Sequence, residues 1–212
     1  MNDIPSTLLS LPQTLRRFFA YASPRILLAQ LVIAGAARSW LGPIRAADGW
    51  LIGAIALYWP LQEWLLHRVL LHARPRTLFD NAAARAHRQH HRDPRDLAFA
   101  LLPAASFRLL VPVHLAFWAA ATRSLPLAST GIAAFSAATL FYEWIHFLCH
   151  APYRPRGAHL RRVRAQHALH HFKNEHYWFA FTVPAIDRLL GTGPDPSRVQ
   201  PSESCRALGG DE

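Results

Sequence analysis

Four long apolar stretches limit the folds that this chain can adopt. They lie near residues 24–44, 49–66, 98–122 and 125–145. A helix needs about 20 mostly apolar residues to cross the hydrocarbon core of a bilayer, and buried helices of soluble proteins usually have shorter apolar stretches. The sequence therefore predicts an all-α membrane protein with four transmembrane helices, in a single membrane domain that covers residues 1–212.

The basic residues give these helices an orientation. The chain has 23 Lys and Arg residues against 13 Asp and Glu residues, and its net charge is +10. Most basic residues precede residue 26 or lie in residues 67–96 and 146–193, whereas the two connections on the opposite side carry only Arg45 and Arg123. Basic loops stay in the cytoplasm, so both termini and both basic segments are expected there. Because topology accounts for the charge, nucleic acid is not an expected partner.

Most histidines fall on this same side of the expected membrane, in four clusters. The clusters are His67 and His72; His87, His90 and His91; His146 and His150; and His167, His170 and His171. Two clusters follow the second expected span and two follow the fourth. An even number of crossings separates the pairs, so all ten side chains are predicted to share one face of the membrane.

The spacing within the clusters suits metal ligands. His146 and His150 are four apart and share a helical face, whereas adjacent histidines point about 100° apart and can serve two ions. His67 and His72 diverge by roughly 140° on an ideal helix, so they too could reach different ions. Neutral imidazole suits iron, zinc, copper and nickel, and ten ligands exceed what one ion can use. The sequence therefore predicts two metal ions with about five nitrogens each.

Four further side chains are expected close to these ligands. Glu63 and Glu143 each precede a histidine pair and are candidates to orient imidazole N–H groups. Tyr142 stands beside Glu143, and His176 follows the last cluster. The cysteines are not expected to bind metal, since Cys149 faces away from the histidine stripe and Cys205 lies in a tail, residues 194–212, that is expected to be flexible.

Other classes of metal protein remain as alternatives. A membrane zinc hydrolase would use similar imidazoles, but the chain has no His-Glu-x-x-His pattern. A metal-binding or transport protein would place its ligands near the middle of the membrane. A bis-histidine haem protein would also pair histidines across spans. The excess of ligands at the span ends favours a dimetal enzyme over all three.

The motifs HRVLLH, HRQHH, HFLCH and HALHH, followed by FAFTVPAIDRLLGT, resemble the fatty acid hydroxylase (sterol desaturase) superfamily. The resemblance runs from about Trp64 to Gly193 and includes the order of the histidine boxes. Tyr142 and Glu143 stand where fatty acid 2-hydroxylases, the members closest in pattern, have a Tyr-Asp pair. Two departures are Glu143 in place of Asp, and Ala180 where many members have glycine.

This resemblance implies a four-helix membrane bundle with a cytoplasmic helical cap that holds two iron ions. It carries over the same ten histidines as ligands. It also implies O2-dependent hydroxylation of a lipid from the bilayer, a fatty acyl chain being the first choice, with electrons from a separate ferredoxin- or cytochrome b5-like carrier. Zinc can occupy such nitrogen sites in a purified protein. Sterol or carotenoid hydroxylation or desaturation within the same superfamily stays open.

Overall fold

The computed structural model describes residues 8–205, and its regular secondary structure is helical. The elements are α1 Leu11–Phe18, α2 Ala22–Trp40, α3 Ala46–Leu65, the π-helix η1 Leu66–Leu71, α4 Ala82–Arg92, the 3-10 turn η2 Ala104–Ser106, α5 Phe107–Thr122, α6 Leu125–His150, α7 Ala158–Phe172, α8 Ala185–Leu189 and the 3-10 turn η3 Pro196–Arg198. One isolated bridge joins Leu9 to Tyr153. The predicted all-α class is confirmed for this part of the chain.

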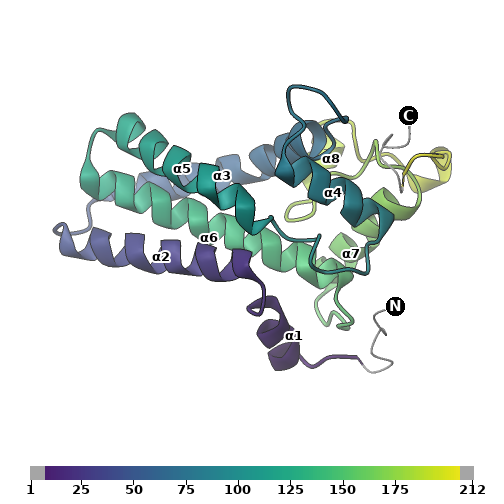
Figure 1. Ribbon diagram of the computed structural model, residues 1–212, viewed down its shortest axis with the longest axis horizontal. Helices are drawn as coiled ribbons and strands as arrows, with labels where there is room; N and C mark the ends of the chain where they lie inside the picture. The colour runs from purple at the N-terminus through teal and green to yellow at the C-terminus, as the bar shows by residue number, and fades with distance from the viewer. Residues whose placement is uncertain (1–7, 206–212) are drawn as a thin grey trace.

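The helices form a bundle with a cap at one end (Figure 1). In the bundle, α6 packs against α2, α3 and α5. The shorter helices α4, α7 and α8 lie together at the other end of the molecule, with the connecting segments around them (Figure 1). Since α3 and α6 both run from the bundle into the cap, the histidines at their ends are carried to the same place.

Two helices are long and apolar enough to cross a membrane, Ala104–Thr122 and Leu125–His150. A third span is possible if α1 and α2, which meet at an angle of 86°, count as one broken span. The predicted number of four is therefore not confirmed. The first two expected spans carry charges that lower their hydropathy, including Arg38 in α2 and Asp48 and Glu63 in α3.

Arg38, which is costly within a membrane unless it faces protein, is buried and paired. Its Nε and Nη2 donate to the two carboxylate oxygens of Asp48 at 2.7 and 2.5 Å, and the hydroxyl of Thr130 donates to the same carboxylate. Nη1 and Nη2 also donate to the carbonyls of Gly42 and Pro43. This network joins α2, α3 and α6 at the bundle end that lies away from the cap.

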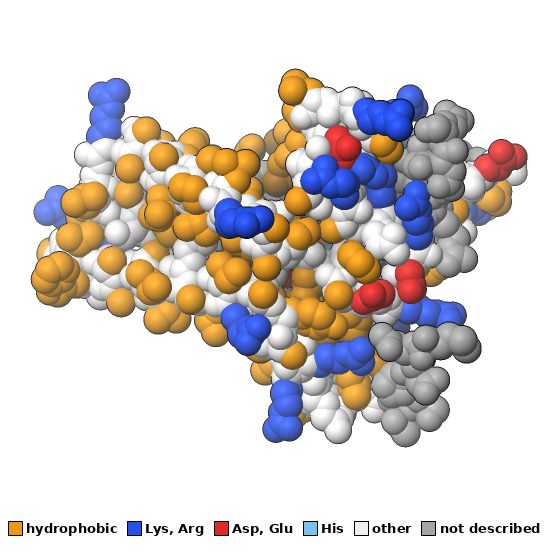
Figure 2. Space-filling model, in the orientation of Figure 1, with side chains coloured by type: hydrophobic (Ala, Val, Ile, Leu, Met, Phe, Trp, Pro, Cys, Tyr) orange, Lys and Arg blue, Asp and Glu red, His pale blue; other side chains and the backbone are white. Residues whose placement is uncertain are grey.

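The outer surface of the bundle is apolar. Its exposed large side chains include Val32, Ile33, Trp50, Leu57, Leu109, Val113 and Phe117. Figure 2 shows hydrophobic side chains spread over this half of the molecule, whereas Lys and Arg side chains gather on the cap. A protein in water rarely exposes an apolar surface of this extent, so the bundle surface is suited to lipid.

The described part of the expected tail, residues 194–205, contacts the cap. Indole Nε1 of Trp178 donates to the carbonyl of Pro194, and the backbone N–H of Ser202 donates to the carbonyl of Lys173. The flexibility that the composition of the tail indicates stays a prediction. Residues 206–212 of the expected tail lie outside the described residues.

Candidate metal centre

The ten predicted histidines come together in the cap as two groups of five. The first group is His67, His72, His87, His91 and His170, and the second group is His90, His146, His150, His167 and His171. Within each group, one ring nitrogen of every residue lies within 4.8 Å of the others. The arrangement has the number of sites, and the number of nitrogens per site, that the spacing predicted.

Two segments have the spacing His-x-x-His-His, one in α4 and one in α7, and each contributes ligands to both groups. His87 and His91 are four apart on α4 and point into the first group, while His90 points into the second. On α7 the order is reversed, because His167 and His171 enter the second group and His170 enters the first. Each helix therefore contributes to both groups, which fixes the two groups side by side.

His67 and His72 do not diverge to different groups as an ideal α-helix would require. The chain changes from α-helix to π-helix at Leu66–Leu71, and the N–H of His72 donates to the carbonyl of His67, five residues earlier. A π-turn closes at i to i+5, so residues five apart come onto one face. Their ring centroids are 5.0 Å apart, and both belong to the first group.

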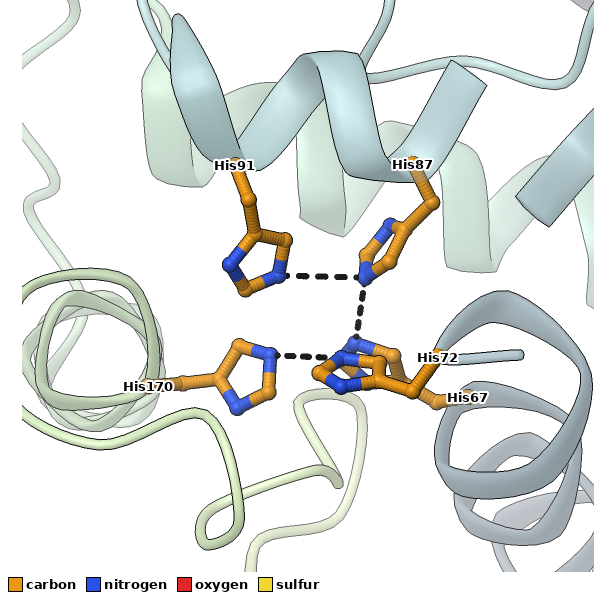
Figure 3. Close-up of side chains that lie close together, drawn as sticks. All are labelled: His67, His72, His87, His91 and His170. Atoms are coloured by element: carbon orange, nitrogen blue, oxygen red, sulfur yellow. Dashed lines mark hydrogen bonds between the residues drawn. The ribbon is translucent and has the colours of Figure 1, made fainter. Parts of the chain in front are cut away.

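Figure 3 shows the rings of the first group converging through their Nε2 atoms. Nε2 of His87 lies 3.1 Å from Nε2 of His67 and 3.2 Å from Nε2 of His91. His72 and His170 meet in the same way at 3.1 Å. In the second group, Nε2 of His150 lies 3.0 Å from Nε2 of His90 and 2.8 Å from Nε2 of His167.

Backbone carbonyls fix which nitrogen of several rings carries the proton. Nδ1 of His67 lies 2.6 Å from the carbonyl oxygen of Phe179, Nδ1 of His170 lies 2.8 Å from that of Tyr177, and Nδ1 of His91 lies 2.8 Å from that of Cys205. A carbonyl only accepts, so each Nδ1 donates and each Nε2 is a bare lone pair. This is the usual way in which proteins orient a metal-binding imidazole.

These lone pairs are placed to bind a metal ion, and they cannot form hydrogen bonds with one another because a lone pair only accepts. His67 and His91 both present a bare Nε2 to His87, which can donate to only one of them. Two nitrogens bound to one ion at about 2.1 Å and at a right angle lie about 3 Å apart, which matches the observed separations. In the second group, Nε2 of His146 is buried without a hydrogen-bond partner among the described residues. The residues present therefore fit one ion in each group.

The groups are buried, and burial keeps the imidazoles neutral. Burial lowers the pKa of His67 to about 4 and that of His91 to about 3. The hydrogen bond from His91 to the carbonyl of Cys205 raises the pKa of His91, but burial has the larger effect. Burial also lowers the pKa values of the other histidines of the two groups that lie outside α6: His72, His87, His90, His167, His170 and His171. A neutral ring is the form that binds a metal ion.

Glu63 and Glu143 do not orient imidazoles directly, contrary to the prediction. The carboxylate of Glu63 accepts the N–H groups of Phe181 and Thr182 at 2.7 and 2.9 Å, together with the Thr182 hydroxyl. Glu143 accepts from the hydroxyl of Ser23 and from the N–H of Leu102 at 2.8 Å. Both carboxylates bind backbone segments beside the groups, a role that spacing before a histidine box does not distinguish from imidazole binding.

Asp187 is the aspartate of the segment FAFTVPAIDRLLGT, which carries part of the family resemblance, and the structure shows what it does. Its carboxylate accepts the N–H groups of Phe179 and Ala180 at 3.0 and 2.8 Å, and the hydroxyl of Thr192 at 2.7 Å. Phe179 is the residue whose carbonyl receives His67. Asp187 thus holds the segment that orients a metal-group histidine, and the aspartate within the motif was the available signal.

A family model described as fatty acid hydroxylase matches residues 52–192, which is most of the chain and includes every histidine of the two groups. The chain belongs to the fatty acid hydroxylase family. Curated relatives include a dihydroceramide fatty acyl 2-hydroxylase of Arabidopsis thaliana, 30% identical over 150 residues that cover 69% of this chain and 61% of that protein. A fatty acid 2-hydroxylase of Rattus norvegicus is 30% identical over 142 residues, covering 64% of this chain and 37% of that protein.

A solved structure titled full-length scs7p, in which only the hydroxylase domain is visible, has the same fold. Its TM-score is 0.70 at 24% identity, and the likeness covers 85% of this chain and 68% of that one. The chain of this fatty acid hydroxylase family member spans about three fifths of the Arabidopsis protein and under two fifths of the rat protein.

The other predicted residues of this hydroxylase-family chain lie beside the groups or away from them. The ring of Tyr142 lies 4.8 Å from that of Phe181 and 6.2 Å from that of His146. His176 is exposed and lies 3.4 Å from a carboxylate oxygen of Glu175, so it is not placed among the ring nitrogens. Cys149 is buried in an apolar cluster with Phe181, as its helical position predicted.

Proposed function

We propose that this chain is a membrane-bound non-haem di-iron hydroxylase that inserts one oxygen atom of O2 into a fatty acyl chain. The observation that carries the proposal is the pair of adjacent five-imidazole groups in a chain of the fatty acid hydroxylase family. The named relatives are 2-hydroxylases, and we infer oxidation of the same acyl carbon here. The reaction consumes O2, two electrons and two protons, and it yields the hydroxylated chain and water.

Each group would hold one iron ion through its five imidazoles. Two iron ions would supply the O2 activation that attack on an unactivated C–H bond requires, since no side chain provides it. The protein supplies the remaining requirements. The Nδ1–H bonds of His67, His91 and His170 to carbonyls aim their lone pairs inward, and eight of the ten rings are buried, while His72 and His150 are half-buried.

A cleft beside the two groups is the proposed route for the acyl chain. It lies between η1, α4, residues 99–103 and α6, and it reaches His87 of the first group and His146 of the second. Its other lining residues include Leu71, Ala83, Ala86, Phe99 and Tyr142. The lining is mostly apolar, and Leu101, Leu102 and Pro103 lead directly into the apolar helix α5. The cleft has a volume of about 20 Å³, so it would have to widen to admit an acyl chain from the bilayer.

The membrane arrangement that we propose has four spans, made by α1 with α2, by α3, by α5 and by α6. The cap and both basic segments would then lie in the cytoplasm, as the distribution of arginines indicates. The electrons would come from a ferredoxin- or cytochrome b5-like carrier. Exposed arginines on the cap, such as Arg74, Arg95 and Arg161, would favour an acidic partner through charge complementarity.

The experiment that tests this function is lipid analysis of a host that expresses the chain under 18O2. Acyl lipids heavier by one labelled oxygen atom are expected, with the hydroxyl on carbon 2. His170→Ala removes a first-group ligand and should abolish the product, whereas His159→Ala, outside both groups, should keep it. The absence of labelled lipid from a host with a working electron carrier would contradict the proposal.

A further inference from the structure

Residues 199–205, here called the strap, lie beyond the matched family region and still touch the metal centre. The family match ends at residue 192. The carbonyl oxygen of Cys205 nevertheless accepts the Nδ1–H of His91 at 2.8 Å. His91 is fully buried, and its Nε2 faces His87 within the first group. The last described residue of the strap thus sets the tautomer and the ring orientation of one histidine in that group.

The strap is tied to the residues that follow α7. The N–H of Ser202 donates to the carbonyl of Lys173 at 2.7 Å, and the side-chain amide of Asn174 donates to the carbonyl of Gln200 at 3.1 Å. Since α7 carries His170 and His171, these bonds fix the position of the strap relative to a helix of the metal centre. Its position is therefore specified by backbone contacts on both sides of Ser202.

Glu175 is the buried anchor of the strap. Its side chain belongs to a residue only 3% exposed, and its Oε1 accepts the hydroxyls of Ser202 and Ser204 at 3.1 and 2.6 Å. Its Oε2 is buried without a hydrogen-bond partner among the described residues. A buried carboxylate is costly unless it makes strong hydrogen bonds. The exposed ring of His176 lies 3.4 Å from Oε1, and both hydroxyl donors to this carboxylate come from the strap, so the strap supplies its hydrogen bonds.

We propose that the strap is a positioning element for the first metal group and that Glu175 is the residue that holds it in place. The inference rests on the proposed function, because it assumes that the first group binds an ion. Loss of a partner that orients a metal-binding imidazole weakens metal binding by about 10–100-fold. The effect should be confined to the first group. The histidine whose Nδ1–H the strap accepts, His91, belongs to the first group, and the second group is made of five other histidines.

The test is a Zn2+ titration of the purified full-length chain against a competing chelator, followed by metal analysis. The wild type is expected to bind two Zn2+. Glu175→Ala should bind one of them with wild-type affinity and the other about 10–100-fold more weakly. Glu203→Ala removes an exposed carboxylate of the strap and should titrate as the wild type. In a His91→Ala background, Glu175→Ala should add no further loss, because the contact that it supports is already absent.

A chain that ends at Gln200 removes the contacts of Ser202, Ser204 and Cys205 and should reproduce the loss of one high-affinity Zn2+. Circular dichroism establishes whether the shortened chain retains its helices. If it does not fold, the result for Glu175→Ala decides the test. Two Zn2+ bound with wild-type affinity in Glu175→Ala, or equal weakening of both ions, would overturn the strap proposal. A wild-type chain that binds fewer than two Zn2+ would instead count against the proposed function.

Discussion

His67 donates its Nδ1–H to the backbone carbonyl of Phe179, at a distance of 2.6 Å. Phe179 in turn is held by Asp187, which accepts its N–H at 3.0 Å. The ring that enters the first group is therefore oriented through one peptide unit by a buried carboxylate. The chemistry of the site thus extends beyond the ten imidazoles to the acidic side chains that bind residues 179–182.

Asp187→Asn tests this chain of contacts. The amide would direct an N–H toward the backbone N–H of Phe179 or Ala180, or toward the Thr192 hydroxyl, and at least one buried bond would be lost. We expect the free energy of unfolding to fall by about 1–3 kcal/mol, with weaker metal retention by the first group. Thermal unfolding and metal analysis check both results. Asp195→Asn is the control, because Asp195 is exposed and only caps a short turn; an equal effect there would refute the assignment.

The metal-free protein should lose stability as the solution is acidified. Burial lowers the pKa of His67 to about 4 and that of His91 to about 3, from 6.5. The unfolded chain therefore binds more protons than the folded chain below pH 6.5. The stabilising contribution is complete above that pH and is lost progressively toward about pH 4 for His67 and about pH 3 for His91. Unfolding temperatures measured in detergent at several pH values check this. An unfolding temperature that stays constant as the pH is lowered from 6.5 to about 4 would contradict neutral, buried rings.

Ala86→Phe tests the proposed route of the acyl chain. Ala86 lines the cleft beside His87, and a benzyl group there would fill space that the substrate needs. We expect product formation to fall by at least about tenfold, equivalent to about 1.4 kcal/mol in the barrier, while both metal ions are retained. The control is Ala98→Phe, because Ala98 is exposed on the neighbouring segment. Undiminished turnover in Ala86→Phe would show that the chain enters elsewhere.

Gly131→Ala tests the contact between α5 and α6. A Cβ at Gly131 would lie 2.4 Å from the ring of Trp118, so the helices would have to separate or the indole would have to move. We expect a loss of about 1–3 kcal/mol in stability. Gly53→Ala is the matched control, since a Cβ there meets nothing within 4 Å. Thermal unfolding of the two variants should separate them, and similar melting temperatures would contradict the close packing.

The sequence predicted which histidines form the site better than it predicted the backbone groups that orient them. The spacing of the histidines and the expected even number of crossings predicted that His87 and His170 lie on one side of the membrane, but they did not predict which histidines form each group. The π-turn that unites His67 with His72 has no reliable signal in composition or periodicity. The carbonyls of Phe179, Tyr177 and Cys205 are backbone groups and carry no residue-type signal at all.

The acidic residues show the same limit. Glu63 was placed correctly near the histidines, but its partners are N–H groups 118 and 119 residues away, which only the folded chain brings near. The number of spans was also uncertain for a physical reason. α3 combines an apolar middle with Asp48 and Glu63 at its ends. Arg38 donates a hydrogen bond to Asp48, and the hydroxyl of Thr182 donates one to Glu63.

The central claim is that two adjacent histidines of one helix serve two different iron ions. The most direct measurement is the iron content of the purified wild type, of His90→Ala and of His91→Ala, with an absorption spectrum of each. The structure assigns His90 to the second group and His91 to the first. We predict two iron ions in the wild type and one retained ion in each variant, with both lost in the double variant. A Soret band, a single ion in the wild type, or loss of the same ion in both variants would contradict the account.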